Sequence, residues 1–324
     1  MLKEVLKHVK TVAIGGHVRP DGDCVGSCLG LYQYIKENYE EIQADVYLED
    51  IPDSFQFIKA AKEIRHEVSD EKEYDLFIVL DCGDKERLGF SKALFEHAKE
   101  TFCVDHHISN LAFADQNYIF PEASSTSELV YRLLDLEKIT KETAECLYLG
   151  IVHDTGVFQY SCTAPETMEA AANLMRKGIN ASEIIEKTFY EKTFAQNQIL
   201  GRALFESFLF MDGKCIVSYI TQRMMEFHGV TPKDLEGIVS QLRVTKGVEV
   251  AVLLYETAPH EYKVSLRASG DVDVSRIAQY FGGGGHKKAA GVTMKGTVHD
   301  VINNLSGQIH LQLKKGRKYG TRSH

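Results

Sequence analysis

The sequence lacks the long apolar run of a membrane protein and the basic character of a protein that binds long nucleic acid. No apolar run approaches the roughly 18 residues that a membrane-spanning helix needs, so we expect no membrane partner. Asp and Glu (46) outnumber Lys and Arg (37), which gives a net charge of −9. Proteins that grip long duplex nucleic acid through its phosphates usually carry a basic surface. The net negative charge is more compatible with a small anionic substrate that a local cluster of cations or metal ions binds than with long nucleic acid.

The cysteines form no disulfide framework and no zinc pattern. There are seven, an odd number scattered along the chain, and only Cys24 and Cys28 lie close together, four residues apart in an apolar helical pattern. We therefore expect reduced thiols in the core of a cytoplasmic protein. The first residues, MLKEVLKHVK, have the pattern of an amphipathic helix on the domain and not that of a secretion signal.

Residues 11–107 alternate short apolar segments with helical ones. Short continuous apolar strands separated by helices are typical of a doubly wound, mainly parallel sheet. We expect strands at 11–18, 44–49, 75–83 and 101–107, with helices at 24–38, 53–61 and 91–100 between them. Helical patterns then continue at 124–138, which begins with capping Ser and Thr residues, and at 140–158, 164–178 and 181–192.

The pattern changes near residue 195 and predicts a second, smaller α+β domain with a mixed sheet. Strand pairs are expected at 205–220, around the turn signal Asp212-Gly213, and at 248–269. A helix (272–281), a glycine loop (282–286), a strand (289–296) and a last helix (299–315) follow, and the basic end from 314 onward is expected to be frayed. We place the domains at 1–190 and 191–324, joined by a helical connector, with the active site in the cleft between them.

Acids and histidines follow the strands of the first domain at the ends that a parallel sheet brings to one edge. The segments GGHVRPDGD, LDCGD and VDHH contribute His17, Asp21, Asp23, Asp81, Asp84, Asp105, His106 and His107. A further acid, Asp154, interrupts an apolar helix beside His153. Taken singly, each segment also fits a turn, a helix N-cap or a packed helix residue. Their convergence on one predicted edge favours a functional site.

Metal binding is the least costly way to hold these carboxylates together, because buried acids at close range cannot all stay ionised without cations. The set is rich in carboxylates, contains imidazoles and needs no thiolate, which suits Mn²⁺, with Mg²⁺ or Fe²⁺ as alternatives. Two divalent ions about 3.5–4 Å apart can clamp a phosphoryl group and lower the pKa of a bound water. The residues therefore predict a metal-dependent phosphoester hydrolase.

The four segments resemble the motifs of the DHH phosphoesterases. HVRPDGD, LDCGD, VDHH and GIVHDTGVF occur in the order of that family, and GGGGHKKAAG resembles the glycine-rich signature of its type-1 associated C-terminal domain. The two-domain form is similar to the branch that contains nanoRNases (oligoribonucleases) and pAp phosphatases. The resemblance implies hydrolysis of very short oligoribonucleotides or linear dinucleotides to mononucleotides, and of 3′-phosphoadenosine 5′-phosphate (pAp) to AMP.

The resemblance also implies roles for the matched residues. One metal would be held by His17, Asp21 and Asp81. The second metal would be held by Asp23, Asp81, His106 and Asp154, with Asp81 as the bridge between the two ions. Asp105 would orient a histidine, as ligand histidines usually require. His107 would face the substrate phosphate, to stabilise charge or to protonate the leaving oxygen.

The second domain is expected to bind the far end of the substrate. Consecutive glycines let a backbone approach a phosphate closely, and their N–H groups can form an anion-binding nest. An arginine suits bidentate phosphate contact or stacking on a base. The candidate residues are Gly283, Gly284, Gly285, His286 and Arg267, with Ser265 and Arg243 as weaker candidates. The spacing is not that of a P-loop. Binding across two domains would favour substrates a few nucleotides long.

Other functions remain open at this point. A cyclic di-AMP phosphodiesterase would use the same residues, and a manganese inorganic pyrophosphatase shares the first-domain motifs but has a different second domain. A processive exonuclease of the family is usually longer. A nucleotide-binding sensor without catalysis belongs to another class, and the filled ligand positions argue against it. A homodimer is compatible with the sequence, which contains nothing that demonstrates one.

Overall fold

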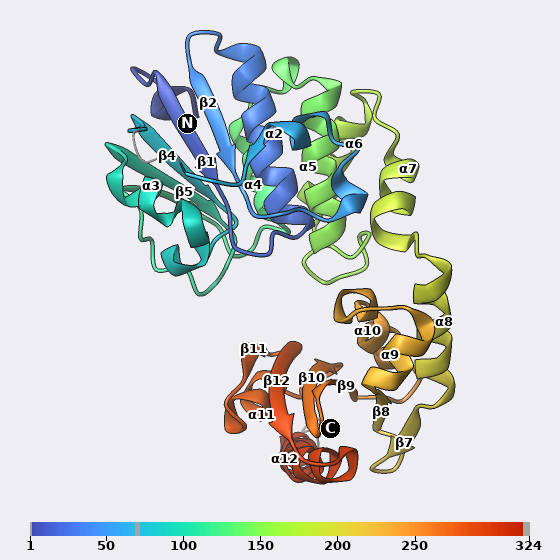
Figure 1. Ribbon diagram of the computed structural model, residues 1–324. Helices are drawn as coiled ribbons and strands as arrows, with labels where there is room; N and C mark the ends of the chain where they lie inside the picture. The colour runs from blue at the N-terminus through green and yellow to red at the C-terminus, as the bar shows by residue number, and fades with distance from the viewer. Residues whose placement is uncertain (1, 69–71, 320–324) are drawn as a thin grey trace. The chain divides into compact units, whose positions relative to one another are not determined.

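The computed structural model describes residues 2–68 and 72–319 of the 324-residue chain. They form two compact units, and the division falls between Glu191 and Lys192 (Figure 1). Each unit is built around one six-stranded sheet. Among the described residues, no helix combines the length and the apolar character that crossing a membrane would require.

The first unit contains an all-parallel sheet with the strand order β3-β2-β1-β4-β5-β6. Its strands are β1 (Thr11–Gly15), β2 (Gln43–Tyr47), β3 (Ile64–Arg65), β4 (Leu76–Leu80), β5 (Glu100–Asp105) and β6 (Gln116–Ile119). Strands β2 and β3 lie on one side of β1, and the later strands β4, β5 and β6 lie on its other side. The carboxyl ends of β1 and β4 therefore flank the switch point of the sheet, where ligands bind in open α/β folds.

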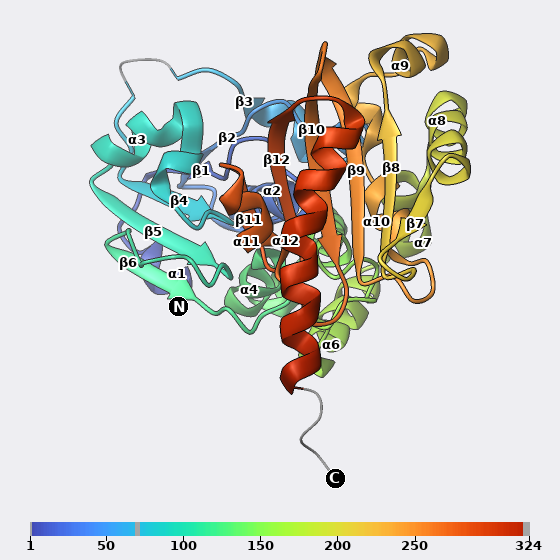
Figure 2. The same ribbon diagram turned by 90° about the horizontal axis from the view of Figure 1, so that it is seen from below.

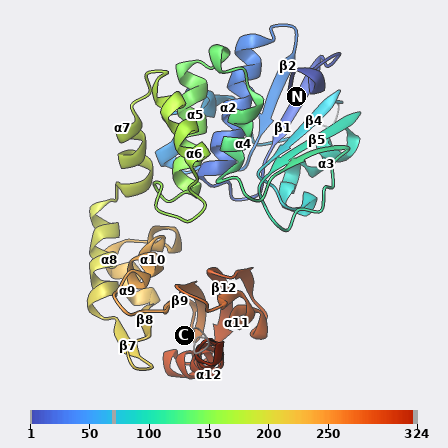
Figure 3. The same ribbon diagram turned by 180° about the vertical axis from the view of Figure 1, so that it is seen from behind.

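Helices cover both faces of this sheet. They are α1 (Leu2–Val5), α2 (Gly22–Asn38), α3 (Lys92–His97), α4 (Thr126–Leu133), α5 (Lys141–Asp154), α6 (Pro165–Met175) and α7 (Ala181–Ile185). Val12 and Ile14 of β1 belong to the core shared with α2, α4 and α5, which lie on the same side of the sheet (Figure 3). Ala13, between them, belongs to the opposite core under α3. Because neighbouring residues of a strand point to opposite faces, both faces are buried and the strand is apolar throughout.

The close packing of α2 against α5 brings two acids of the site together. A Cβ atom added at Gly26 would lie 2.5 Å from the carbonyl oxygen of Cys146, so the two helix backbones nearly touch. A Cβ atom added at Gly150 would lie 2.7 Å from Oδ1 of Asp23. The glycines thus let the first turn of α2, with Asp23, lie beside the last turn of α5, which ends at Asp154.

The second unit contains a mixed sheet with the strand order β11-β12-β10-β9-β8-β7, in which only β8 and β9 are parallel. The strands are β7 (Phe208–Phe210), β8 (Cys215–Ile220), β9 (Val250–Ala258), β10 (Glu261–Ala268), β11 (Gly284–His286) and β12 (Ala289–Lys295). The helices are α8 (Phe194–Phe205), α9 (Gln222–His228), α10 (Ile238–Arg243), α11 (Val274–Tyr280) and α12 (Val298–Tyr319). Helices α11 and α12 pack on one face and α8, α9 and α10 on the other; Figure 2 shows α12 across β10 and β12.

The prediction of a doubly wound parallel sheet followed by a smaller mixed sheet is confirmed, but several local predictions were wrong. The sequence patterns missed β3 and β6, the two short strands at the edges of the first sheet. The helix expected at 53–61 is instead two short 3₁₀ helices, Asp53–Phe55 and Lys59–Glu63. Helix α12 extends through the first part of the basic end to Tyr319, and residues 320–324, the rest of that end, lie outside the described part of the chain.

The glycine loop expected at 282–286 was also wrong, since Gly284–His286 form strand β11. This strand pairs antiparallel with the first half of β12, and Gly285 has a φ of 140°. A Cβ atom added at Gly285 would lie 2.5 Å from the carbonyl oxygen of Ala289. Glycine is therefore needed here for the close approach of two strands, although its low strand propensity pointed to a loop.

Candidate metal centre

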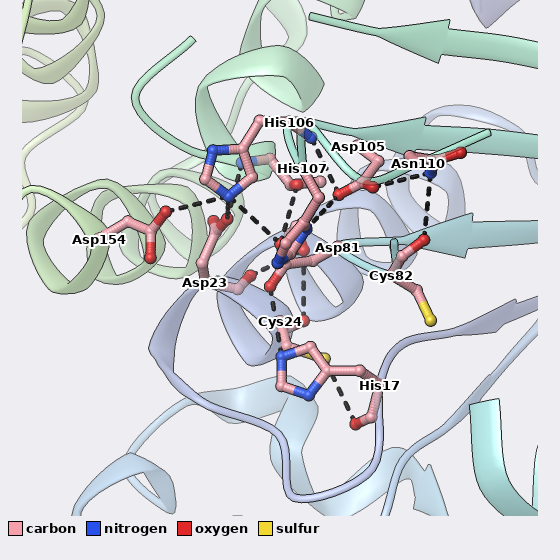
Figure 4. Close-up of polar contacts among 12 residues, drawn as sticks. His17, Asp23, Cys24, Asp81, Cys82, Asp105, His106, His107, Asn110 and Asp154 are labelled. Carbon is pink, nitrogen blue, oxygen red and sulfur yellow. Dashed lines mark hydrogen bonds and ion pairs between the residues drawn. The ribbon is translucent and has the colours of Figure 1, made fainter. Parts of the chain in front are cut away.

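The expected acids and histidines of the first unit meet at the carboxyl edge of its sheet (Figure 4). His17 follows β1, Asp81 follows β4, and Asp105 ends β5 immediately before His106 and His107. The two remaining acids come from helices, Asp23 from the first turn of α2 and Asp154 from the end of α5. Of these residues, His17, Asp23, Asp81 and Asp105 are buried.

Asp81 lies between two sets of histidines. Its Oδ2 atom is 3.5 Å from Nε2 of His17, whereas its Oδ1 atom is 3.6 Å from Nε2 of His106 and 3.7 Å from Nδ1 of His107. The residue has a φ of 55°, a left-handed conformation that Asp adopts more readily than most residues. One carboxylate that offers a different oxygen to each set has the geometry of a bridging ligand.

The donor atoms form three overlapping groups in which every pair lies within 4.8 Å. These groups are His17, Cys24 and Asp81; Asp81, His106 and His107; and Asp23, His106 and Asp154. In the last group Nε2 of His106 is 3.1 Å from Oδ2 of Asp154 and 4.0 Å from Oδ2 of Asp23. The residues expected to hold the second metal are thus brought together around His106.

Asp21 stands outside these three groups. Its Oδ1 atom lies 3.6 Å from Nε2 of His17 and also accepts hydrogen bonds from the backbone N–H groups of Asp23 and Cys24. It is therefore the N-cap of α2 as well as a neighbour of His17. Nδ1 of His17 lies 2.9 Å from the carbonyl oxygen of Val18. Donation of Nδ1–H to that oxygen leaves Nε2 with a lone pair for a cation.

Asp105 anchors the histidine pair. Its Oδ1 atom accepts the backbone N–H of His106 and lies 2.7 Å from Nδ1 of His107. Its Oδ2 atom accepts a 2.7 Å hydrogen bond from Nδ2 of Asn110, which also donates to the carbonyl oxygen of Cys82. The sequence reasoning missed Asn110, which lies only three residues beyond His107. The available signal was the residue type, because Asn side chains often form the hydrogen bonds that hold a turn together.

The sequence reasoning also missed the first turn of α4. The backbone N–H groups of Thr126 and Ser127 donate to Oδ2 and Oδ1 of Asp23, at 2.6 and 2.8 Å. The hydroxyl of Thr126 donates to Oδ1 of Asp81 at 3.1 Å. These residues were interpreted only as helix caps. The available signal in the sequence was the run SSTS, because a helix cap needs only one hydroxyl residue and this run has four. In the structure all four residues are buried.

The electrostatics of the centre show an excess of negative charge. Burial raises the pKa of Asp23 well above its ordinary value, and the charges of Asp81 and Asp154 raise it further. Burial and the charge of Asp81 also raise the pKa of Asp154. Burial would lower the pKa of His17, but its hydrogen bonds with Asp21 and Asp81 raise it to about 12. Divalent cations fit this donor set, because they would take the place of the protons that the carboxylates otherwise hold.

Two neighbouring residues have structural roles. The ring of His153 packs edge-on against Phe55 and Phe189, and its Nε2 atom lies 2.9 Å from the hydroxyl of Thr188. Burial lowers the pKa of His153 to about 4, which keeps the ring neutral. Asp84 is the N-cap of the 3₁₀ helix Lys85–Ser91 and accepts from the N–H of Glu86. Neither side chain belongs to the three donor groups.

Four of the candidate substrate residues of the second unit, Ser265, Arg267, Gly284 and His286, lie on strands β10 and β11, and both strands pair with β12. In the sheet register Arg267 of β10 pairs with Ala289 of β12, which pairs with His286 of β11. Ser265, two residues before Arg267, lies on the same face of β10 and opposite Gly291, which pairs with Gly284. Gly283 immediately precedes β11, and Arg243 is the last residue of α10, which packs on β9. The guanidinium of Arg267 donates to the carbonyl oxygen of Leu266.

The fold and the site define an α/β protein with a carboxylate- and histidine-rich cluster, whose donor groups could hold a metal ion, at the switch point of a parallel sheet. Comparison with protein families makes this more specific. The model of the DHH family, N-terminal domain, matches residues 11–151, and that of the DHHA1 domain matches residues 212–314. The chain belongs to the DHH family of phosphoesterases.

Several relatives resemble the chain over most of its length. A protein of Thermus thermophilus described as "Bifunctional oligoribonuclease and PAP phosphatase NrnA" is 29% identical over 300 residues, 91% of this chain and 88% of that protein. A Bacillus subtilis protein with the same description is 27% identical over 291 residues, 88% of this chain and 89% of the relative. Among solved structures, an exopolyphosphatase-related protein from Bacteroides fragilis has a TM-score of 0.88 at 27% identity and covers 95% of this chain and 94% of its own.

Proposed function

We propose that this phosphoesterase hydrolyses very short oligoribonucleotides and linear dinucleotides to mononucleotides, and pAp to AMP. The observation that carries the proposal is the position of Asp81, whose two carboxylate oxygens lie near different histidines. The names of the Thermus thermophilus and Bacillus subtilis relatives supply the nucleotide class, at 29% and 27% identity. Two divalent ions, Mn²⁺ by ligand type, would polarise the phosphoryl group and activate water when bound.

In this proposal the residues of the first unit hold the ions and handle charge. His17, Asp21 and Asp81 serve one ion, and Asp23, Asp81, His106 and Asp154 serve the other. Asp105 accepts Nδ1–H of His107, which leaves Nε2 of that ring for the substrate phosphate or the leaving oxygen. The hydrogen bond to Asp105 raises the pKa of His107, so the ring is better able to carry the proton that the leaving oxygen needs.

The second unit supplies contacts to the non-reacting part of the substrate. Arg267 is the main candidate, because a guanidinium binds a phosphate in a bidentate manner or stacks on a base. Ser265 and Arg243, the glycines Gly283, Gly284 and Gly285, and His286 complete the proposed set. Such contacts add affinity for nucleotides without taking part in the chemical step, so they separate a nucleotidase from an esterase of broad specificity.

The test is a hydrolysis panel with Mn²⁺ and product analysis. It compares pAp, pApA, a 5-nucleotide RNA, a 24-nucleotide RNA, cyclic di-AMP and pyrophosphate at equal concentration. We expect mononucleotides from the short linear substrates, AMP from pAp, and little turnover of the 24-nucleotide RNA. A preference for cyclic di-AMP or for pyrophosphate would replace the proposal with one of those activities. Nucleotide binding without turnover of any substrate would indicate a sensor.

A further inference from the structure

The first turn of α4 holds two of the proposed metal ligands at once. Both carboxylate oxygens of Asp23 accept a backbone N–H from this turn, at 2.6 Å from Thr126 and 2.8 Å from Ser127. Asp81, which follows a different strand, accepts the hydroxyl of Thr126 at 3.1 Å. Thr126 therefore contacts the acid assigned to one ion and the acid that bridges both.

This turn is itself held in place by hydrogen bonds to residues that are not among the proposed metal ligands. Ser125 caps α4 by accepting the N–H of Glu128. The carboxylate of Glu128 is 1% exposed and accepts hydrogen bonds from the hydroxyls of Ser124 and Thr167, and from Arg132. Thr167 belongs to the first turn of α6, so Glu128 ties the start of α4 to a second helix. The donors that meet Asp23 and Asp81 are thus fixed by folding and not by the bound ion.

We propose that Thr126 is a positioning residue for metal binding, which acts through Asp23 and Asp81 and does not touch the ion. A carboxylate that already accepts one hydrogen bond at a chosen oxygen has lost its free rotation, so its remaining lone pairs point in a fixed direction. Orienting both acids through one residue also fixes the direction of one relative to the other. The inference rests on the metal centre of the proposed function and is independent of which nucleotide is the substrate.

The experiment is calorimetric titration of Mn²⁺ into the metal-free full-length protein. Thr126→Val keeps the backbone N–H and the shape of the side chain but removes the hydroxyl, whereas Thr126→Ser keeps the hydroxyl. Removing such an outer contact typically costs about 10–100-fold in metal affinity. We expect a loss in this range for Thr126→Val and affinity close to wild type for Thr126→Ser. The melting temperature of the metal-free protein separates this effect from a general loss of structure.

A matched control is Thr143→Val on α5. Thr143 is also fully buried and donates to a carboxylate, that of Glu37, but it does not belong to the centre. We expect its Mn²⁺ affinity to equal that of the wild type. If Thr126→Val does not fold, the pair Thr126→Ala and Thr126→Ser makes the same comparison, since these two differ in a single oxygen atom.

The proposal is overturned if removing the hydroxyl of Thr126 leaves Mn²⁺ affinity at the wild-type value in a folded protein. It is also overturned if Thr143→Val lowers the affinity as much as Thr126→Val, because a buried threonine anywhere in the unit would then matter equally. These outcomes differ from a failure of the proposed function. In that case the wild-type protein would bind Mn²⁺, respond to Thr126→Val, and turn over no nucleotide in the hydrolysis panel.

Discussion

The Oδ1 atom of Asp105 lies 2.7 Å from Nδ1 of His107, and the same carboxylate receives hydrogen bonds from His106 and Asn110. Burial raises the pKa of Asp105, but the contact with His107 outweighs it and keeps the pKa below its ordinary value. Asp105 is therefore an ionised acceptor with three donors around it, from His106, His107 and Asn110. Its contact with Nδ1 fixes the ring of His107, and the proposed function assigns the other nitrogen, Nε2, to the substrate.

Replacing Asp105 with Asn tests this relationship. An amide presents one acceptor oxygen and one NH₂ group, so at least one of the three donors around Asp105 would face another donor. We expect kcat on pApA to fall about 10–100-fold, as when an outer contact of a ligand histidine is removed, with little change in KM. Steady-state kinetics in saturating Mn²⁺ measure this.

The control for Asp105→Asn is Asp115→Asn. Asp115 accepts hydrogen bonds from Thr101 at the other end of β5, away from the metal centre. Its substitution should leave kcat near the wild-type value. Equal kcat values for Asp105→Asn and the wild-type protein would show that the orientation of His107 does not limit turnover.

Asp81→Asn should have the largest effect of any single substitution in the centre. It removes the charge from the one carboxylate that lies near both sets of histidines. A bound metal stabilises the transition state by several kcal/mol, and losing this stabilisation corresponds to a fall in kcat/KM of about 100- to 1000-fold. Calorimetry should show weaker Mn²⁺ binding in the same variant.

Asp84→Asn is the natural comparison, because Asp84 belongs to the same segment, LDCGD, but caps a 3₁₀ helix. We expect its activity to stay near wild type while its thermal stability falls slightly, since an N-cap is worth about 0.5–2 kcal/mol and Asn is also a good cap. Near-normal turnover in Asp81→Asn would contradict the assignment of Asp81 as the bridge.

The sequence was sufficient to predict those parts of the site that follow from strand direction. Parallel strands end at one edge, so polar residues after β1, β4 and β5 had to lie close together, and the structure places His17, Asp81 and His106 there. Asp154 was predictable for another reason. An acid inside an apolar helix must find a partner, and α5 meets α2 along Gly150, which leaves Asp154 beside His106.

Contacts between distant segments could not be predicted in this way. The hydrogen bonds from Thr126 and Ser127 to Asp23 span 103 and 104 residues, and only the packing of α4 beside α2 creates them. Strand β11 was missed for a related reason. Its glycines favour a loop locally, and pairing with β12 decides the outcome.

Arg267→Ala tests the proposed grip of the second unit on nucleotides. Loss of a charge-assisted hydrogen bond, worth about 1.5–3 kcal/mol, should raise KM for pApA about 10–100-fold. Hydrolysis of bis(p-nitrophenyl) phosphate, which has no nucleoside, should change little. Lys263→Ala is the matched control, because Lys263 is an exposed cation on the same face of β10. Equal losses of activity on both substrates would show that Arg267 supports the fold of the second unit and does not bind the nucleotide.

A network remote from the centre gives a prediction about stability. Asp45 of β2 is buried and accepts hydrogen bonds from Tyr74, Arg65 and Lys72. Burial raises the pKa of Asp45, but the hydrogen bonds from Lys72 and Tyr74 outweigh burial and lower it. A carboxyl whose pKa is lower in the folded protein stabilises the fold at pH values above its unfolded pKa of about 3.9, and this contribution disappears as the pH falls through the folded pKa.

Asp45→Asn should therefore lower the free energy of unfolding by about 1–3 kcal/mol at pH 7, because the buried hydroxyl of Tyr74 and the side chains of Arg65 and Lys72 lose a charged acceptor. The difference from the wild-type protein should narrow below about pH 4, as the wild-type carboxyl itself takes up a proton. Urea unfolding of both proteins at pH 7 and at several values below pH 4 measures this. A difference that stays constant over the whole range would mean that the network stabilises the first unit through its packing and not through the charge of Asp45.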